Sequence, residues 1–209
     1  MNALRRLHRF SALAVGAYAL VHLANHLAAL LGVAHHIAFM DAVRQVTREP
    51  VVEALLLGAV IVQVGSGLRL AWGRYRARRA PPPSSFARLQ ALSGLYLAFF
   101  LLVHVGSVMV GRTVLGLDTN FYFAAAGLQV APYYLFFVPY YGLAVTALVL
   151  HLACAMRRLL PSGASPARGK RIGQAGIAGG IVLAVLIVAA FSGVFHPIAL
   201  PPTYLATFR

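Results

Sequence analysis

Acidic side chains are nearly absent from this chain. Four Asp and Glu stand against eighteen Lys and Arg, which gives a formal net charge of +14 at pH 7. Such a basic excess suits nucleic-acid binding, but here the cations form short clusters between apolar segments. With 60% hydrophobic residues and a mean hydropathy of +0.79, the chain is also too apolar for an ordinary soluble domain. We therefore expect lipid, and not nucleic acid, to contact most of its surface.

Cysteine is scarce as well. The single residue, Cys154, excludes an internal disulfide, and no CxxC motif or Cys/His cluster offers a zinc or iron–sulfur site. Neither a flavin-binding fold nor a dicarboxylate pocket is visible in the sequence. We therefore do not expect this chain to be an enzyme by itself.

Long apolar segments dominate what is present. Five of them have the length of about 20 residues that a membrane-spanning helix needs. They cover residues 10 to 31, 51 to 73, 89 to 111, 132 to 156 and 173 to 195. A signal peptide is a competing interpretation of the first, but that segment is long enough to span and more spans follow it. The predicted fold is an all-α integral membrane protein with five transmembrane helices.

The basic clusters predict the orientation of these helices. Fourteen of the eighteen cations lie before the first span, between the second and third, or between the fourth and fifth. They are Arg5, Arg6, Arg9, Arg69, Arg74, Arg76, Arg78, Arg79, Arg88, Arg157, Arg158, Arg168, Lys170 and Arg171. By the positive-inside rule these zones are cytoplasmic, which places the N-terminus inside and the C-terminus outside the cytoplasmic membrane. Proline-rich stretches at 81–85 and 161–166 separate the spans on that side.

The outer connections have a different character. Residues 35–47 place Ile37, Met40, Val43 and Val46 at helical spacing, which predicts a short helix on the membrane interface. The stretch 112–131 is rich in aromatic residues, which favours anchoring at the headgroup level over a ligand cage. Thr47-Arg48-Glu49-Pro50 is typical of a helix start, with proline in the first turn.

Two stretches repeat each other at an offset of 82 residues. Arg6, Leu7, Ser11, Leu13, Val21 and His22 match Arg88, Leu89, Ser93, Leu95, Val103 and His104. Each copy begins with arginine at a water boundary and reaches its histidine sixteen residues later. His22 and His104 are therefore expected at one depth on parallel helices.

A histidine inside a membrane span is costly enough to need a reason. Two imidazoles at one depth can ligate the iron of a haem from opposite sides, so His22 and His104 are the predicted metal ligands. The alternative is a hydrogen-bonded pair that only joins helices. His26, one turn beyond His22, suits a haem propionate, a quinone oxygen or an alternative axial ligand, and an interfacial histidine fits it equally well.

The sequence supplies only one of the two ligands that a second haem nearer the inner face needs. His151 lies in the inner half of the fourth span, but the second span has Gln63 and Ser66 as its only neutral polar side chains of any reach. Glutamine is a poor haem ligand. Arg69 fits snorkelling to lipid phosphates better than pairing with a propionate.

At the inner mouth of the first span, His8, Arg9 and Ser11 form a polar group. These side chains are suited to donate hydrogen bonds to a quinone carbonyl. Helix capping and lipid contact explain the same residues equally well. Glu53, at the outer start of the second span, suits the positive end of the helix dipole.

Four motifs resemble the cytochrome b membrane anchor of succinate dehydrogenase and fumarate reductase in its single-chain, five-helix form. Leu7-His8-Arg9-Phe10-Ser11 is similar to the opening motif of that family, and Val21 to His26 is similar to its first haem segment. Ser93-Gly94 through His104, and Leu150 to Ala153, resemble two further haem segments. Gln63 to Arg69 has the pattern of the second helix, except that glutamine replaces the ligand histidine. The resemblance covers about residues 5 to 158.

The resemblance implies a b-type cytochrome that anchors flavoprotein and iron–sulfur subunits on the cytoplasmic side and passes electrons to quinone. It implies haem b held by His22 and His104, with His151 left as half of an inner site, and a quinone near Arg9 and Ser11. Residues 1–171 would form the four-helix bundle, and residues 172–209 the fifth helix and an outer tail. A stand-alone haem protein of this fold and a haem-free membrane scaffold are the alternatives.

Overall fold

The computed structural model describes residues 2–76, 84–157 and 166–208. Five long helices dominate it, and each is long and apolar enough to cross a membrane. They are α1 (Asn2–Ala28), which continues as a 3-10 turn η1 (Ala29–Leu31), then α3 (Pro50–Arg76), α4 (Ser85–Thr113), α6 (Tyr134–Arg157) and α7 (Pro166–Phe191). Short helices α2 (Val33–Thr47), α5 (Phe121–Gln129) and α8 (Pro202–Leu205) and a 3-10 turn η2 (Ala206–Phe208) connect or follow them. No strand occurs within the described ranges.

The predicted all-α membrane fold with five spans is confirmed. Large apolar side chains such as Leu55 (69% exposed) and Ile61 (72%) face outward along the spans, as lipid contact requires. The fifth helix begins at Pro166, which is earlier than the predicted boundary at residue 172. Residues 81–83 and 161–165 of the proline-rich connections, and Arg78, Arg79 and Arg158, lie outside the described ranges.

Local sequence sets the helix boundaries. Gly32 has a φ of +114°, a conformation that other residues rarely adopt, and it separates η1 from α2. Pro50 opens α3 as predicted. The Ser84 hydroxyl accepts a hydrogen bond from the Ala87 amide and caps α4. Asn120 caps α5 in the same way through Tyr122.

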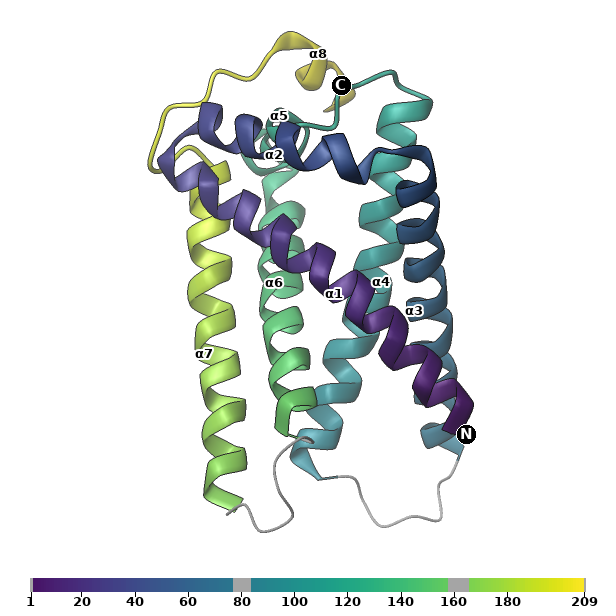
Figure 1. Ribbon diagram of the computed structural model, residues 1–209. Coiled ribbons are helices and arrows are strands. Elements are labelled where there is room, and N and C mark those ends of the chain that lie inside the picture. The colour runs from purple at the N-terminus through teal and green to yellow at the C-terminus, as the bar shows by residue number, and fades with distance from the viewer. Residues whose placement is uncertain (1, 77–83, 158–165, 209) are drawn as a thin grey trace.

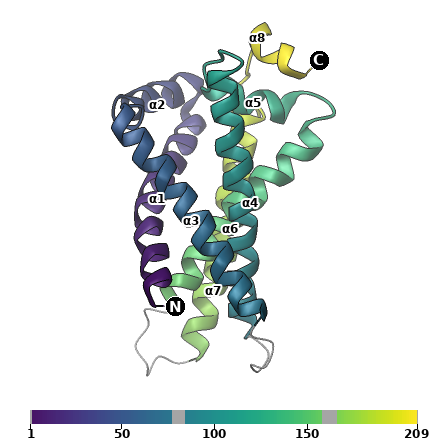
Figure 2. The same cartoon turned by 90° about the vertical axis from the view of Figure 1, so that its right-hand side faces the viewer.

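Four spans, α3, α4, α6 and α7, form a row, and α1 contacts both ends of it. α1 packs on α3, α3 on α4, α4 on α6, and α7 lies along α6 (Figures 1 and 2). α1 is tilted across the bundle, from α3 at one end towards α7 at the other (Figure 1). As a result α1 and α4 have few close backbone contacts, and their side chains must bridge the space between them.

The two ends of the bundle differ. One end, here called the capped end, is crossed by α2 and α5 and carries α8 (Figure 1). The other, the basic end, holds the start of α1, the end of α3, the start of α4, the end of α6 and the start of α7. The expected helix within 35–47 is confirmed as α2, which lies across the capped end with His36 and Met40 facing inward.

The main apolar cluster lies under the cap. Phe121 of α5 is 1% exposed and stacks on Phe191 of α7 with ring centroids 4.5 Å apart. Ala29, Leu128 and Val145 belong to the same cluster. The aromatic residues of 112–131 were expected at the headgroup level, but Phe121 is a core residue because α5 folds back over the bundle.

Ion pairs fasten the capped end. Arg44 of α2 donates to the Asp118 carboxylate at 2.9 Å, and Arg48 donates to the Thr119 hydroxyl at 3.2 Å. Glu53, expected to face the helix dipole of α3, also binds Arg112 of α4. Tyr204 of α8 donates to the backbone carbonyl of Asp118 at 2.8 Å, which ties the C-terminal segment to the same point.

Candidate functional site

His22 of α1 and His104 of α4 meet within the membrane-spanning part of the bundle. Their ring centroids are 5.9 Å apart and their planes are inclined by 61°. Both side chains are partly buried. The backbones of α1 and α4 are not close neighbours along their length. The two histidines meet because the tilt of α1 carries His22 across the bundle towards α4. The predicted approach of the two repeat histidines is therefore present.

Aromatic rings hold both imidazoles in place. Phe100 stacks on His104, with centroids 4.9 Å apart and planes within 12°. Tyr141 of α6 meets the same ring edge-on at 6.3 Å, and Tyr18 stacks on His22 at 5.7 Å. Stacked and edge-on contacts restrict ring rotation, so both imidazoles have defined orientations.

A row of histidines extends from His22 to the cap. His26 Nε2 lies 3.0 Å from His22 Nε2, and His26 Nδ1 lies 3.3 Å from His36 Nε2. The rings of His26 and His36 are nearly parallel, with centroids 5.5 Å apart. His26 thus lies on the His22 face of α1, as its spacing predicts, and it links His22 to a residue of α2.

His36 is the member of this row that the sequence pattern did not single out. It is 2% exposed and meets Phe121 and Phe191 edge-on at 5.2 and 5.3 Å. Burial, with the neighbouring positive groups of His22 and Arg44, lowers the pKa of His36 to about 4. The available signal was the spacing of His36 and Met40, one turn apart on the inward face of α2.

The hydrogen bonds between His36, His26 and His22 favour one set of donors and acceptors. Nδ1 of His36 is buried without a partner in the structure. An unpaired buried N–H is more costly than an unpaired lone pair. The favoured tautomers therefore have His36 Nε2–H donating to His26 Nδ1, and His26 Nε2–H donating to His22 Nε2. In this arrangement the Nε2 lone pair of His22 accepts the hydrogen bond from His26.

A second polar cluster lies towards the basic end, between α1 and α3. The Ser11 hydroxyl donates to Gln63 Oε1 at 2.6 Å, and His8 Nδ1 lies 2.9 Å from the Ser66 hydroxyl. Gln63 Nε2 approaches His8 Nε2 at 3.4 Å. Of the three residues expected at this mouth, the structure joins His8 and Ser11, whereas Arg9 is exposed.

His151 is engaged on the other hairpin, between α4 and α6. Its Nδ1 lies 3.1 Å from the Ser93 hydroxyl. A Cβ at Gly94 would lie 2.9 Å from His151 Cε1, so the close approach needs glycine at that position. His151 and Gln63 are thus bound within separate hairpins. Arg69 is exposed on α3.

The described residues bring two imidazoles from different helices together and do not form a multidentate metal site. In the described parts of the chain, no three or more His, Cys, Asp or Glu side chains converge as metal ligands. The imidazoles of His22 and His104 instead form one edge-on pair between two spans. Comparison with protein-family models, curated proteins and solved structures finds no match to this chain.

Proposed function

We propose that this chain is a membrane cytochrome that holds haem b between His22 and His104. The observation that carries the proposal is the pair of imidazoles from α1 and α4, whose centroids lie 5.9 Å apart. Two rings that each give one nitrogen to a metal at about 2 Å have centroids roughly 6 Å apart. The ring separation therefore fits bis-histidine ligation.

His26 affects the ligand strength of His22. The Nε2 lone pair of His22 accepts a hydrogen bond from His26, so iron and His26 compete for the same lone pair. When bound, haem supplies one-electron redox chemistry. The residues of this chain supply the ligands, hold them by Phe100 and Tyr141, and keep water out through the apolar spans.

The larger role that we propose is the cytochrome b anchor of a succinate dehydrogenase or fumarate reductase-like complex. Flavoprotein and iron–sulfur subunits would bind at the basic end, on the cytoplasmic side, and electrons would pass between them and quinone. The order of the motifs along the chain supports this role. The cluster of His8, Ser11, Gln63 and Ser66 supports it further, since hydroxyl, amide and imidazole groups can donate to quinone oxygens.

Histidine substitutions test the haem assignment. His22→Ala and His104→Ala should each abolish the low-spin haem spectrum, because bis-histidine ligation needs both rings. His151→Ala should retain it, since that residue is bound to Ser93 in another layer. The pyridine haemochrome assay measures haem type and stoichiometry, and an unchanged spectrum in either of the first two variants would exclude this pair.

A stand-alone haem protein of the same fold is the second candidate. It is favoured by Gln63, whose side chain is held by Ser11 and His8 where an inner haem ligand is expected. Electrons from a dehydrogenase at the basic end would then have a long distance to cross. Co-purification of flavin and iron–sulfur subunits with the tagged chain would count against this candidate. Absence of Soret absorbance from protein made with ample haem would favour a scaffold instead.

A further inference from the structure

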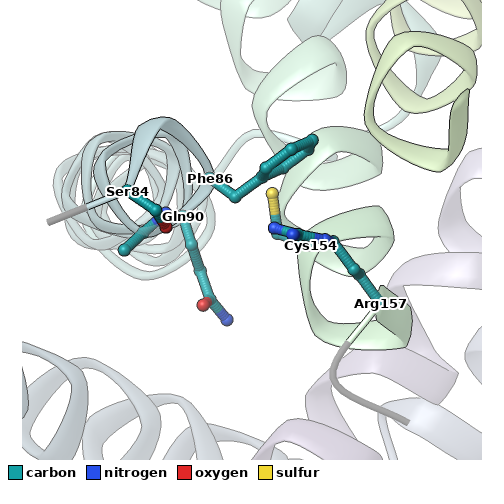
Figure 3. Close-up of a pocket in the computed structure, with 6 residues that line it drawn as sticks. Ser84, Phe86, Gln90, Cys154 and Arg157 are labelled. Carbon is teal, nitrogen blue, oxygen red and sulfur yellow. Dashed lines mark hydrogen bonds between the residues drawn. The ribbon is translucent and has the colours of Figure 1, made fainter. Parts of the chain in front are cut away.

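A cavity of about 230 Å³ opens at the basic end, between the start of α4 and the last turn of α6 (Figure 3). Its walls are formed by Ser84, Phe86, Ala87, Gln90, Cys154 and Arg157. Gln90 is fourteen residues before His104 on the same helix, which corresponds to roughly 21 Å. The cavity is therefore separate from the histidine site, and its interpretation does not depend on haem.

Arg157 is the cation among the residues that line this cavity. Its guanidinium carbon lies 3.8 Å from the centroid of the Phe86 ring. On the side of α7, a Cβ at Gly169 would come 2.5 Å from Arg157 Nε, so the absence of a side chain there makes room for the arginine. Figure 3 shows the Arg157 side chain extending from α6 back towards Phe86 and Cys154. The guanidinium is thus held by packing, while its planar edge remains available for hydrogen bonds.

No carboxylate of this chain neutralises that charge. The four acids are Asp41, Glu49, Glu53 and Asp118, and all of them belong to the capped end. There Asp41, Asp118 and Glu53 pair with Arg44, Arg48 and Arg112. The counter-charge for an arginine fixed at the basic end must therefore come from another molecule.

We propose that this cavity binds the phosphate of an anionic phospholipid headgroup. Arg157 donates to the phosphate oxygens, and the Gln90 amide provides a second donor from the opposite wall. Lipid is the source because α4 and α6 leave the apolar span at this level, where headgroups lie. The volume equals roughly eight waters at about 30 Å³ each, which suits one phosphate with its glycerol carbons and not a folded peptide.

Cys154 provides the readout: it is the only cysteine of the chain, it is 4% exposed, and it lines the cavity, so a small maleimide reaches its thiol through that cavity. Purified protein in a neutral maltoside detergent is alkylated with a small maleimide while dioctanoyl phosphatidylglycerol is titrated in. We expect a saturating decrease of about fivefold or more in the alkylation rate, because the headgroup covers the thiol. The zwitterionic dioctanoyl phosphatidylcholine should slow the reaction less than about twofold.

Variants assign the effect to the cavity. Arg157→Gln should raise the half-protecting concentration of phosphatidylglycerol about tenfold or more, and Arg157→Lys should fall between it and the natural chain, because lysine keeps the charge without the planar fork. Arg74→Gln is the matched control: it removes the same charge from an exposed residue at the same end, outside the cavity. It should change the half-protecting concentration less than about twofold.

Four results would overturn the proposal. Equal protection by the two lipids would remove the role of net charge, and equal effects of Arg157→Gln and Arg74→Gln would remove the role of the cavity. Protection by inorganic phosphate at the same concentrations would assign the site to a free anion. Protection by polyglutamate but by neither lipid would assign it to an acidic protein. If circular dichroism shows Arg157→Gln to be misfolded, Gln90→Leu takes its place, with an expected weakening of about threefold or more.

Discussion

At the scale of single residues, the histidines show which contacts a sequence pattern can reach. His22 and His104 follow from the 82-residue repeat, because equal distance from an arginine boundary sets equal depth on two helices. His36 does not follow, since its contact with His26 depends on how α2 folds back after Gly32. The partners of Gln63 were likewise beyond prediction, because the rotation of α1 against α3 decides that Ser11 and His8 face it.

Stability should fall at acid pH because of His36. The unfolded chain binds a proton at this residue near pH 6.5, whereas the folded protein binds it only near pH 4. Between these values the unfolded state carries more protons, so stability is complete above pH 6.5 and is lost as the pH falls towards 4. The full loss is about 3 kcal/mol.

The melting temperature in detergent at pH 7.5 and pH 4.5 measures this loss. His36→Gln should melt with a smaller difference between the two pH values than the natural chain. His35→Gln, on the exposed face of the same helix, should keep the difference of the natural chain. Equal differences in all three proteins would show that His36 does not determine the acid sensitivity.

A further residue-scale prediction concerns the inner site. Gln63→His provides an imidazole at the position where the resemblance to cytochrome b anchors implies a ligand, opposite the hairpin that contains His151. If the Ser11 and His8 contacts of Gln63 are all that prevents ligation, the ratio of haem to protein should rise from about one to about two. The pyridine haemochrome assay measures the ratio. A ratio that stays near one would mean that the Ser93 bond holds His151 away as well.

At the scale of elements, glycine sets the distance between α6 and α7. A Cβ at Gly176 would lie 2.5 Å from the Cβ of Ala153, whereas a Cβ at Gly179 meets nothing within 4 Å. Gly176 is buried against α6, and Gly179 is exposed. The two positions therefore separate the effect of packing from that of helix propensity.

Gly176→Ala should lower the free energy of unfolding by about 1 to 3 kcal/mol, because the two helices must move apart. Gly179→Ala should leave it unchanged or raise it by up to about 1 kcal/mol, since alanine favours helix over glycine. Unfolding by sodium dodecyl sulfate in mixed micelles, followed by circular dichroism, gives both values. Equal effects at the two positions would contradict the close contact of α6 with α7.

The capped end depends on Asp118, which joins α2 to the segment before α5. Asp118→Ala removes the acceptor of Arg44 and should cost about 1 kcal/mol, as expected for a pair partly open to water. Faster hydrogen exchange in α2 should accompany the loss. Asp41→Ala is the control, because Asp41 contacts the same arginine at a longer distance, 3.8 Å, and is 60% exposed. Unchanged exchange in the Asp118 variant would mean that apolar packing alone holds α2.

At the scale of the whole molecule, the sequence predicted most of the fold. Five spans follow from segment length and hydropathy, and the structure contains all five. The cap does not follow, because α5 and α8 are short and their burial comes from tertiary contacts of Phe121 and Tyr204. The periodicity of the apolar residues does not predict helix tilt either. The tilt of α1 is what brings His22 to His104.

The charge distribution predicts the topology of the molecule in the membrane. Within the described ranges, eleven cations and no acid belong to the basic end, so that end should remain in the cytoplasm. Alkaline phosphatase fused after residue 209 should be active, since the enzyme matures only outside, and a fluorescent protein fused there should stay dark. The reverse result would place the capped end inside.

The cap also determines how a flat ligand reaches the histidines. α2 and α5 lie across the end of the bundle nearest to His22 and His26, and Tyr204 and Arg44 fasten that lid through Asp118. Entry along the bundle axis is therefore blocked once the chain has folded. Under the proposed function, a porphyrin would be inserted sideways from the bilayer between α1 and α4, or be enclosed while the chain is still assembling, and enclosure would make loading a step of biogenesis.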